Sequence, residues 1–145
     1  MILPRGVIVL IADGGRMLLL RNTGDAQAPD LEVIAHRDRP APPNRDLSSA
    51  APGRSFSSAS PRRSAYDEGD PHARQEHAFL DAAAKIAARQ IDQRTPGIIV
   101  AADPLSLGYL REHYPKPIAD KVLAELAKDF TGMPVEAITA HLLAV

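Results

Sequence analysis

Arginine and serine side chains crowd the middle of this sequence, in a stretch that reads APGRSFSSASPRRSAY from residue 51. Guanidinium groups make bidentate contacts with phosphate, so this composition is typical of a segment that binds a polyanion. Serine and glycine let the backbone approach a ligand and donate hydrogen bonds, while aromatic rings stack on nucleobases. We therefore predict an RNA-binding site made of Gly53, Arg54, Ser55, Phe56, Arg62, Arg63, Ser64, Tyr66 and His72.

The same segment also fits a purely connecting role. An acidic cluster closes it, Asp67, Glu68 and Asp70, and its arginines could pair with these residues instead of with a ligand. Prolines and serines recur from residue 40 to residue 71, so no regular element is predicted there. A connection of this length is unusual within a compact domain and favours a function. We expect residues 45–66 to be the most mobile internal part of the free protein.

Carboxylates stand where a metal-dependent hydrolase could use them. Asp13 ends the first predicted strand, and Asp103 follows a later one. Asp70 and Glu76 lie at the start of a long predicted helix. Enzymes of the ribonuclease H type use carboxylates to hold two divalent cations about 3.5 to 4 Å apart for phosphodiester hydrolysis. Each of these residues also has a structural explanation, as a turn residue, a helix cap or an exposed helical charge. We predict that no metal is bound and keep the hydrolase as the alternative.

The other reactive side chains do not complete a catalytic site. His72 and His77 are five residues apart, which on a helix separates them by about 140° and not by one turn. No Gly-x-Ser-x-Gly motif activates a serine, and the chain contains no cysteine. We therefore predict a binding protein without catalytic residues and without a cofactor.

Size and charge narrow the class of protein further. The chain has 145 residues, of which 45% are hydrophobic and 24% charged, and its net charge is -1. This length suits one compact domain, which we expect to span residues 1–145. Because a nearly neutral chain has no general attraction to nucleic acid, RNA binding would have to be local. The apolar run from Val7 to Ala12 is too short for an export signal or a membrane span, so we predict a cytoplasmic protein without a membrane partner.

Three apolar runs near the amino terminus predict the first strands of a sheet. Residues 7–12 and 17–21 are joined by Asp13-Gly14-Gly15, whose residues tolerate the positive φ of a hairpin turn. Both runs are almost continuously apolar, which indicates strands covered on both faces. Residues 31–38 alternate more clearly and predict a third strand of this meander, near the edge.

A long helix is predicted after the arginine–serine segment. Asp70 is a suitable N-cap, and Pro71 suits the first helical position. The expected apolar stripe consists of Phe79, Ala83, Ile86, Ala87 and Ile91.

The carboxyl-terminal half predicts alternating strands and helices. Residues 98–102 read as a buried strand, followed by a helix from Pro104 to about His113. From residue 116 to residue 132 propensity favours a helix, although a short strand in its second half is also compatible with the pattern. A last amphipathic helix is expected to begin near Pro134.

Several motifs carry a resemblance to a known family. They are VLIADGGRMLLLRNTGD near the start, PGRSFSSAS and RRSAYDEGDPHARQEHAF in the middle, and VAADPLSLGYLREHY and KDFTGMPVEAI toward the end. With them the chain resembles the bacterial host attachment protein family, single-domain relatives of the middle domain of class I release factors and of Pelota. The resemblance implies an α/β fold, a mixed, ribonuclease H-like sheet of about five strands with helices on both faces. It also implies a helix over residues 117–121 and a strand over residues 122–128.

The resemblance implies binding rather than peptide release. In class I release factors the corresponding loop carries Gly-Gly-Gln, which places a water on the peptidyl-tRNA ester. The loop of this chain, about residues 40–71, has no Gly-Gly pair, and there is no glutamine between Glu32 and Gln75. What the resemblance implies is an RNA- or ribosome-associated accessory factor whose partner is the ribosome or a structured RNA. A protein–protein adaptor is a further alternative, and any host-attachment phenotype would be indirect.

Overall fold

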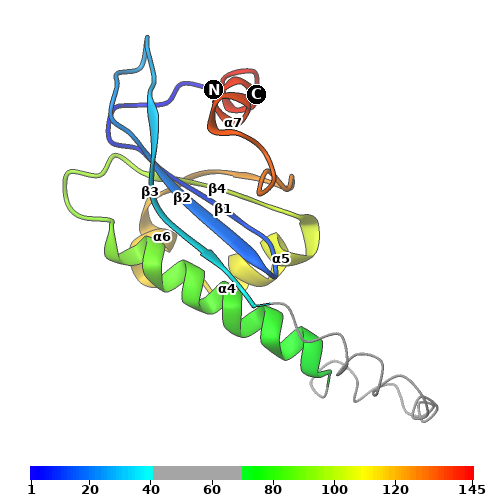
Figure 1. Ribbon diagram of the computed structural model, residues 1–145. Helices are drawn as coiled ribbons and strands as arrows, with labels where there is room; N and C mark the ends of the chain where they lie inside the picture. The colour runs from blue at the N-terminus through cyan, green and yellow to red at the C-terminus, as the bar shows by residue number, and fades with distance from the viewer. Residues whose placement is uncertain (41–69) are drawn as a thin grey trace.

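The computed structural model describes residues 1–40 and 70–145 (Figure 1). The elements in chain order are β1 (Ile8–Ala12), β2 (Arg16–Asn22), β3 (Leu31–Asp38), α4 (Pro71–Arg89), β4 (Ile98–Ala102), α5 (Pro104–Glu112), α6 (Lys116–Lys121), β5 (Val122–Leu126) and α7 (Val135–Leu143). Three strands thus come first, and helices alternate with the remaining strands. This is the α/β class that the sequence predicts.

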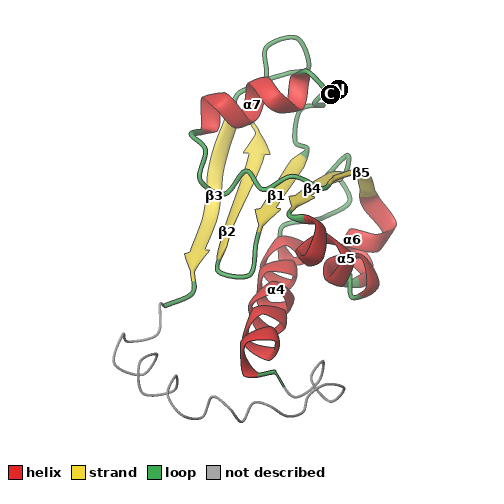
Figure 2. Ribbon diagram, turned by 90° about the vertical axis from the view of Figure 1, so that its right-hand side faces the viewer, coloured by secondary structure: helices red, strands yellow, loops and turns green. Residues whose placement is uncertain are grey.

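The strands form one mixed sheet with the order β3-β2-β1-β4-β5 (Figure 2). β1, β2 and β3 are the predicted antiparallel meander, and β3 lies at the edge. β4 pairs with β1, and β5 with β4, in parallel. Parallel neighbours require crossover connections, which run through α4 and through α5 and α6. Because β1 and β4 are parallel, their carboxyl ends meet at one edge, with Asp13 and Asp103 next to each other in the topology.

Helices cover both faces of the sheet, as the sequence predicts (Figure 1). Successive side chains of a strand point to opposite faces. In β1, Ile8 and Leu10 belong to the hydrophobic cluster under α4, α5 and α6, whereas Val9 and Ile11 belong to the cluster under α7. Every residue of β1 and of β4 is buried, which explains their almost continuous apolar sequences.

The long helix α4 begins as predicted, but its apolar stripe is shifted. The Asp70 side chain accepts a hydrogen bond from the His72 N–H, and Pro71 occupies the first turn. The buried residues of α4 are Leu80, Ala83, Ala84 and Ala87. The larger predicted side chains Phe79, Ile86 and Ile91 lie only partly buried at the flank. Alanines face the sheet because a small side chain lets the helix backbone approach the strands closely.

The chain between Lys116 and Leu126 shows which of two conflicting signals prevails. α6 ends at Lys121, and Val122 already has extended backbone angles, φ -67° and ψ 126°. β5 then pairs with β4, although VLAEL has good helix propensity. Hydrogen bonding to the open edge of β4 outweighs that propensity. The predicted change from helix to strand is confirmed, with the strand ending at Leu126.

The β1–β2 turn forms where it is predicted, but for a different reason. Among the described residues only Gly6 has a positive φ, so Gly14 and Gly15 do not use the left-handed conformation that we expected. Instead, Asp13 Oδ1 accepts hydrogen bonds from the backbone N–H groups of Gly15 and Arg16, each at 2.8 Å. The Asp13 side chain therefore holds the turn.

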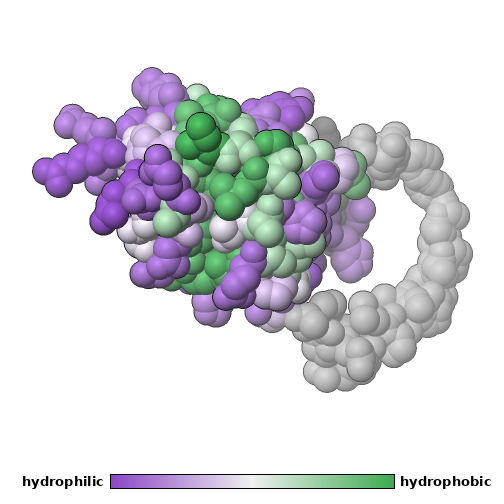
Figure 3. Space-filling view, turned by 90° about the horizontal axis from the view of Figure 1, so that it is seen from above, coloured by the Kyte–Doolittle hydropathy of each residue, from purple (hydrophilic) through white to green (hydrophobic). Residues whose placement is uncertain are grey.

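Both chain ends lie beside α7, far from the amino-terminal end of α4 (Figure 1). The Met1 amino group donates hydrogen bonds to the carbonyl groups of Leu142 and Leu143. Apolar side chains gather on the face over this end (Figure 3), where Ile2, Leu143 and Val145 are exposed. None of the helices in the described part of the chain has the length and apolar character that crossing a membrane requires.

Candidate functional site

The predicted RNA-binding residues divide between described and undescribed parts of the chain. Eight of them lie outside the described residues: Gly53, Arg54, Ser55, Phe56, Arg62, Arg63, Ser64 and Tyr66. His72 is described, in the first turn of α4, and is exposed. Its backbone N–H donates a hydrogen bond to Asp70 Oδ1 at 2.9 Å.

The described residues that flank this segment lie close together. The Arg39 N–H donates to the Gly15 carbonyl at 2.7 Å, which holds the end of β3 against the β1–β2 turn. The Arg39 guanidinium donates to Gln75 Oε1 of α4 at 3.0 Å. These two hydrogen bonds place both flanks of residues 41–69 at the same edge of the sheet, beside the carboxyl end of β1.

Asp13 occupies the same edge and is held by several hydrogen bonds. Besides the two turn N–H groups, the Thr131 hydroxyl lies 3.1 Å from Asp13 Oδ2. An Arg16 guanidinium nitrogen is 3.9 Å from that oxygen. Partial burial raises the pKa of Asp13, but the hydrogen bonds from Gly15, Arg16 and the side chains near it lower the pKa more. Asp13 therefore stays ionised to below the usual pH for an aspartate.

Asp103 follows β4 and caps α5, as the sequence predicts. Its Oδ2 accepts a hydrogen bond from the Ser106 N–H at 3.2 Å. Its Oδ1 is buried and has no hydrogen-bond partner among the described residues. A buried carboxylate oxygen without a donor is costly to the fold, so this atom lacks a structural explanation.

Glu76 reaches the same edge from α4. A Cβ atom added to Gly14 would lie 2.8 Å from Glu76 Cγ and 3.0 Å from Glu76 Oε2. The absence of a side chain at Gly14 is thus what lets the Glu76 carboxylate lie over the β1–β2 turn. Gly14 is needed here because it lets the Glu76 side chain approach the backbone closely, and the sequence alone does not show this contact.

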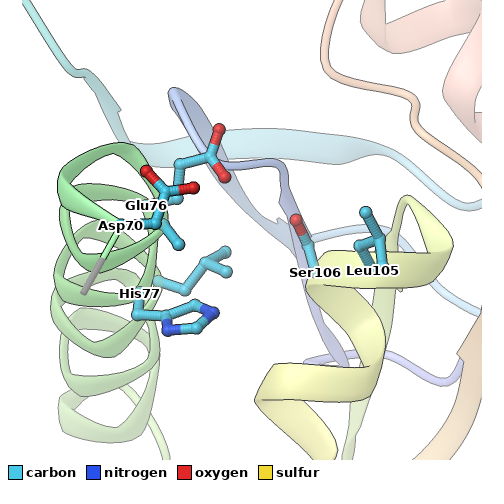
Figure 4. A pocket seen from close by; sticks show the side chains of 7 residues that line it. Asp70, Glu76, His77, Leu105 and Ser106 are labelled. Atoms are coloured by element: carbon cyan, nitrogen blue, oxygen red, sulfur yellow. The ribbon is translucent and has the colours of Figure 1, made fainter. Parts of the chain in front are cut away.

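Two adjoining clefts open among these groups. One, of about 420 Å³, lies between the first turns of α4 and α5, and includes Asp70, Glu76, His77 and Ser106 (Figure 4). The other, of about 380 Å³, adds Asp13, Asp103 and Asp129. Glu76, Leu105 and Ser106 line both. None of the lining residues in the described ranges is a lysine or an arginine, so the lining of the two clefts is acidic.

The carboxylates do not make a recognisable metal centre. Among residues 1–40 and 70–145, no group of three or more histidine, aspartate or glutamate side chains is placed to hold a metal ion. The structural roles considered for Asp13, Asp70 and Asp103, as a turn residue and as helix caps, are confirmed. The hydrolase alternative gains no support from this geometry.

Sequence reasoning missed a stack of three rings between α4 and α5. The Tyr109 ring stacks on His77 at 3.9 Å and on His113 at 4.0 Å between ring centroids. The Tyr109 hydroxyl donates to the Asp81 carboxylate, at 3.1 Å and 3.0 Å from its two oxygens. Burial and this bond raise the pKa of Tyr109. The four-residue spacing of Tyr109 and His113 was a usable signal, but the contact with His77 depends on how the helices pack.

Comparison with known protein families gives a match over almost the whole chain. The family model for the bacterial archaeo-eukaryotic release factor family 12 matches residues 6–142. No curated protein matches the sequence significantly.

Proposed function

Because the chain belongs to the bacterial archaeo-eukaryotic release factor family 12, we propose that it is an RNA- or ribosome-associated accessory factor. Its membership confirms the resemblance to release-factor-like domains, whereas the narrower host attachment assignment stays a prediction. The proposed contact is the arginine–serine segment, residues 50–72, with Arg54, Arg62 and Arg63 as phosphate ligands. Without Gly-Gly-Gln, the proposal does not include peptide release.

The observation that carries this proposal is the anchoring of the two flanks of the segment. Arg39 is bonded both to Gly15 of the β1–β2 turn and to Gln75 of α4. The described flanks on the two sides of the segment therefore lie at one edge of the sheet. The arginines of the segment are close together in the sequence, and phosphate contacts gain from such clustering.

The charge of the rest of this edge also supports a role for the arginines. Five carboxylates, Asp13, Asp70, Glu76, Asp103 and Asp129, line the two clefts. Phosphate would be repelled by these groups, since like charges destabilise each other at short range. RNA contact at this edge would thus avoid the two clefts and use the arginine–serine segment beside them.

Sedimentation with ribosomes tests the proposal. Wild-type protein should pellet with purified ribosomes at low ionic strength and be released progressively as salt is added, since phosphate contacts are screened. A variant with Arg54→Gln, Arg62→Gln and Arg63→Gln should be released at clearly lower salt. Glutamine keeps polarity and most of the side-chain length while removing the charge.

The control variant carries the same charge change at the opposite edge of the sheet. All three residues are exposed: Arg5 precedes β1, Arg89 ends α4, and Arg94 lies in the loop before β4. Changing these three residues to glutamine should leave sedimentation as in the wild type. Equal release of both triple variants would show nonspecific charge attraction, and no sedimentation of the wild type at any salt would contradict the proposal.

A further inference from the structure

Three aromatic rings form a column between α4 and α5. The Tyr109 ring stacks on His77 and on His113, with ring centroids 3.9 Å and 4.0 Å apart and planes inclined by 8° and 16°. Two rings that are both nearly parallel to Tyr109 at these distances must lie on its opposite faces. His77 and His113 are therefore the two ends of the column, and each has one ring face that Tyr109 does not cover.

The uncovered face of His77 belongs to the cleft between the first turns of α4 and α5. His77 lines this cleft with Leu105 and Ser106 of the first turn of α5, whereas Tyr109, in the next turn, does not line it. Figure 4 shows the His77 side chain extending from α4 toward α5. Within the described residues no second ring stacks on His77, and no hydrogen bond of its ring nitrogens is found. The column thus ends at an open space, and a further planar ring in the cleft would extend it.

The column is held from two positions of α4. Asp81 lies one turn after His77, and its carboxylate accepts the hydrogen bond of the Tyr109 hydroxyl. This bond and the stacking on His77 fix the Tyr109 ring, which in turn fixes the plane of the His77 ring. A platform that is already ordered loses little conformational freedom when a ligand stacks on it, which favours binding.

The rest of the cleft defines the kind of ring that fits. Its volume of about 420 Å³ is within the range of small-molecule sites, about 300 to 1,000 Å³. Ala73, Leu80 and Leu105 provide apolar walls, and Leu105 is 87% exposed and so is available to cover a stacked ring. The Glu76 carboxylate lines the same cleft and makes no hydrogen bond or ion pair with a described residue. Because a carboxylate only accepts hydrogen bonds and repels phosphate, the ring should carry N–H donors and no phosphate.

We propose that this cleft binds an aminopurine base without a phosphate group, stacked on His77 and with its amino group directed to Glu76. Every nucleobase can stack on an aromatic side chain, and a purine offers the larger ring. The exocyclic amino group supplies the hydrogen-bond donor for Glu76. The proposal is independent of RNA binding, since it concerns a free base or nucleoside and none of the residues 41–69 is part of the site.

Nuclear magnetic resonance titration of the full chain tests this site. Adenosine should move the ring-proton signals of His77 upfield in a saturable way, because the base stacks on that ring. Purine riboside lacks the amino group and should bind about tenfold more weakly, as expected for loss of a hydrogen bond to a charged group. Adenosine monophosphate should also bind more weakly, because the cleft repels its phosphate. Adenine has the same ring, and whichever of adenine and adenosine binds more tightly identifies the source as a free base or a nucleoside.

Three results of the titration would overturn the proposal. The first is the absence of a saturable shift of the His77 ring protons with adenosine or adenine. The second is equally tight binding of purine riboside or of adenosine monophosphate. The third is tighter binding of N-acetyl-tryptophan amide than of adenosine, which would assign the cleft to an aromatic side chain of a protein partner.

Variants at the two ends of the column locate the base, with affinities read from the amide signals of Ala73 and Leu80. His77→Ala removes the platform and should weaken adenosine binding about tenfold or more, within the range for base stacking on aromatic side chains. His77→Phe keeps a ring there and should retain binding. His113→Ala removes the ring at the other end, outside the cleft, and should change the affinity by less than about twofold. Equal losses from His77→Ala and His113→Ala would show that the column only packs the two helices, and would overturn the proposal.

Discussion

The edges of the sheet at the amino and the carboxyl ends of β1 and β4 use polar side chains in opposite ways. At the amino end of β1, Asn22 is 1% exposed, and both the nitrogen and the oxygen of its side-chain amide make hydrogen bonds. Its nitrogen donates to the carbonyl groups of Leu3 and Pro4, and its oxygen accepts from the N–H groups of Gly24 and Asp30. At the carboxyl end, Asp103 Oδ1 is also buried, but no described group donates to it.

This difference separates structural from functional polar groups. A buried side chain with all its hydrogen bonds made contributes to the fold, and removing it leaves its partners unpaired. A buried acceptor without a partner costs stability, and it can be retained because it serves a function. We therefore expect substitutions at the amino edge to act on stability, and substitutions at the carboxyl edge to act on binding.

The largest effect on stability is expected from Asn22→Ala. The substitution leaves several buried N–H and carbonyl groups without partners, which should lower the free energy of unfolding by about 3 kcal/mol. Chemical denaturation measures this. Gln93→Ala, at an exposed position of the loop before β4, is the control and should change it by less than about 0.5 kcal/mol. A small effect of Asn22→Ala would mean that its hydrogen bonds do not hold this edge.

Gly24 and Gly14 extend the comparison of the two edges, because a Cβ atom added at each would meet a different kind of neighbour. A Cβ atom at Gly24 would collide with the backbone oxygen of Ala28, which cannot move without the loop. A Cβ atom at Gly14 would meet the flexible side chain of Glu76. Gly24→Ala should therefore cost about 2 kcal/mol and Gly14→Ala less than about 1 kcal/mol. Thermal unfolding of the two variants checks the order, and the reverse order would contradict it.

Asp13 should contribute to stability in a pH-dependent way. Asp13→Ala removes two turn hydrogen bonds and should cost about 1 kcal/mol at neutral pH. Because the pKa of Asp13 is lowered from 3.8 in the folded state, the ionised carboxylate stabilises the fold above that pH. This contribution is lost as the pH falls through the lower folded pKa. The difference between wild type and variant in denaturation should therefore shrink at strongly acidic pH, whereas a constant difference would assign the effect to packing.

The smallest effect on stability is predicted for Asp103→Asn. The cap on α5 is kept, and the unpartnered oxygen loses its charge, so the free energy of unfolding should fall by less than about 0.5 kcal/mol. Denaturation at neutral pH measures it. A loss of 2 kcal/mol or more would show that Asp103 is as structural as Asn22, and the contrast between the two edges would fail.

Much of the fold was predictable because its signals are local. The caps at Asp70 and Asp103 and the buried strand over residues 98–102 follow from short motifs. The position of the turn at Asp13 was predicted correctly, but its cause was not. Hydrogen bonds to the Asp13 side chain hold the turn, and its glycines do not have positive φ. The strand β5 could be predicted only from the family resemblance, because its sequence favours a helix and only pairing with β4 makes it a strand.

The site was less predictable because it depends on packing between distant segments. Glu76 lies over Gly14, and Asp103 lies beside both, only because α4 and α5 cross the same edge. The sequence did suggest that Asp13, Glu76 and Asp103 could share a place, but it could not show which oxygens would be left unpaired. Of the predicted RNA-binding residues, His72 alone lies within the described chain.

The salt dependence of RNA binding tests the central claim most directly, since it counts phosphate contacts. Each contact with single-stranded RNA contributes about 0.7 to the slope of log affinity against log salt. The variant with Arg54, Arg62 and Arg63 changed to glutamine should therefore have a slope smaller by about 2 than the wild type. The variant with Arg5, Arg89 and Arg94 changed should keep the wild-type slope. Equal slopes for wild type and the first variant, with both proteins folded by thermal unfolding, would contradict RNA binding by the arginine–serine segment.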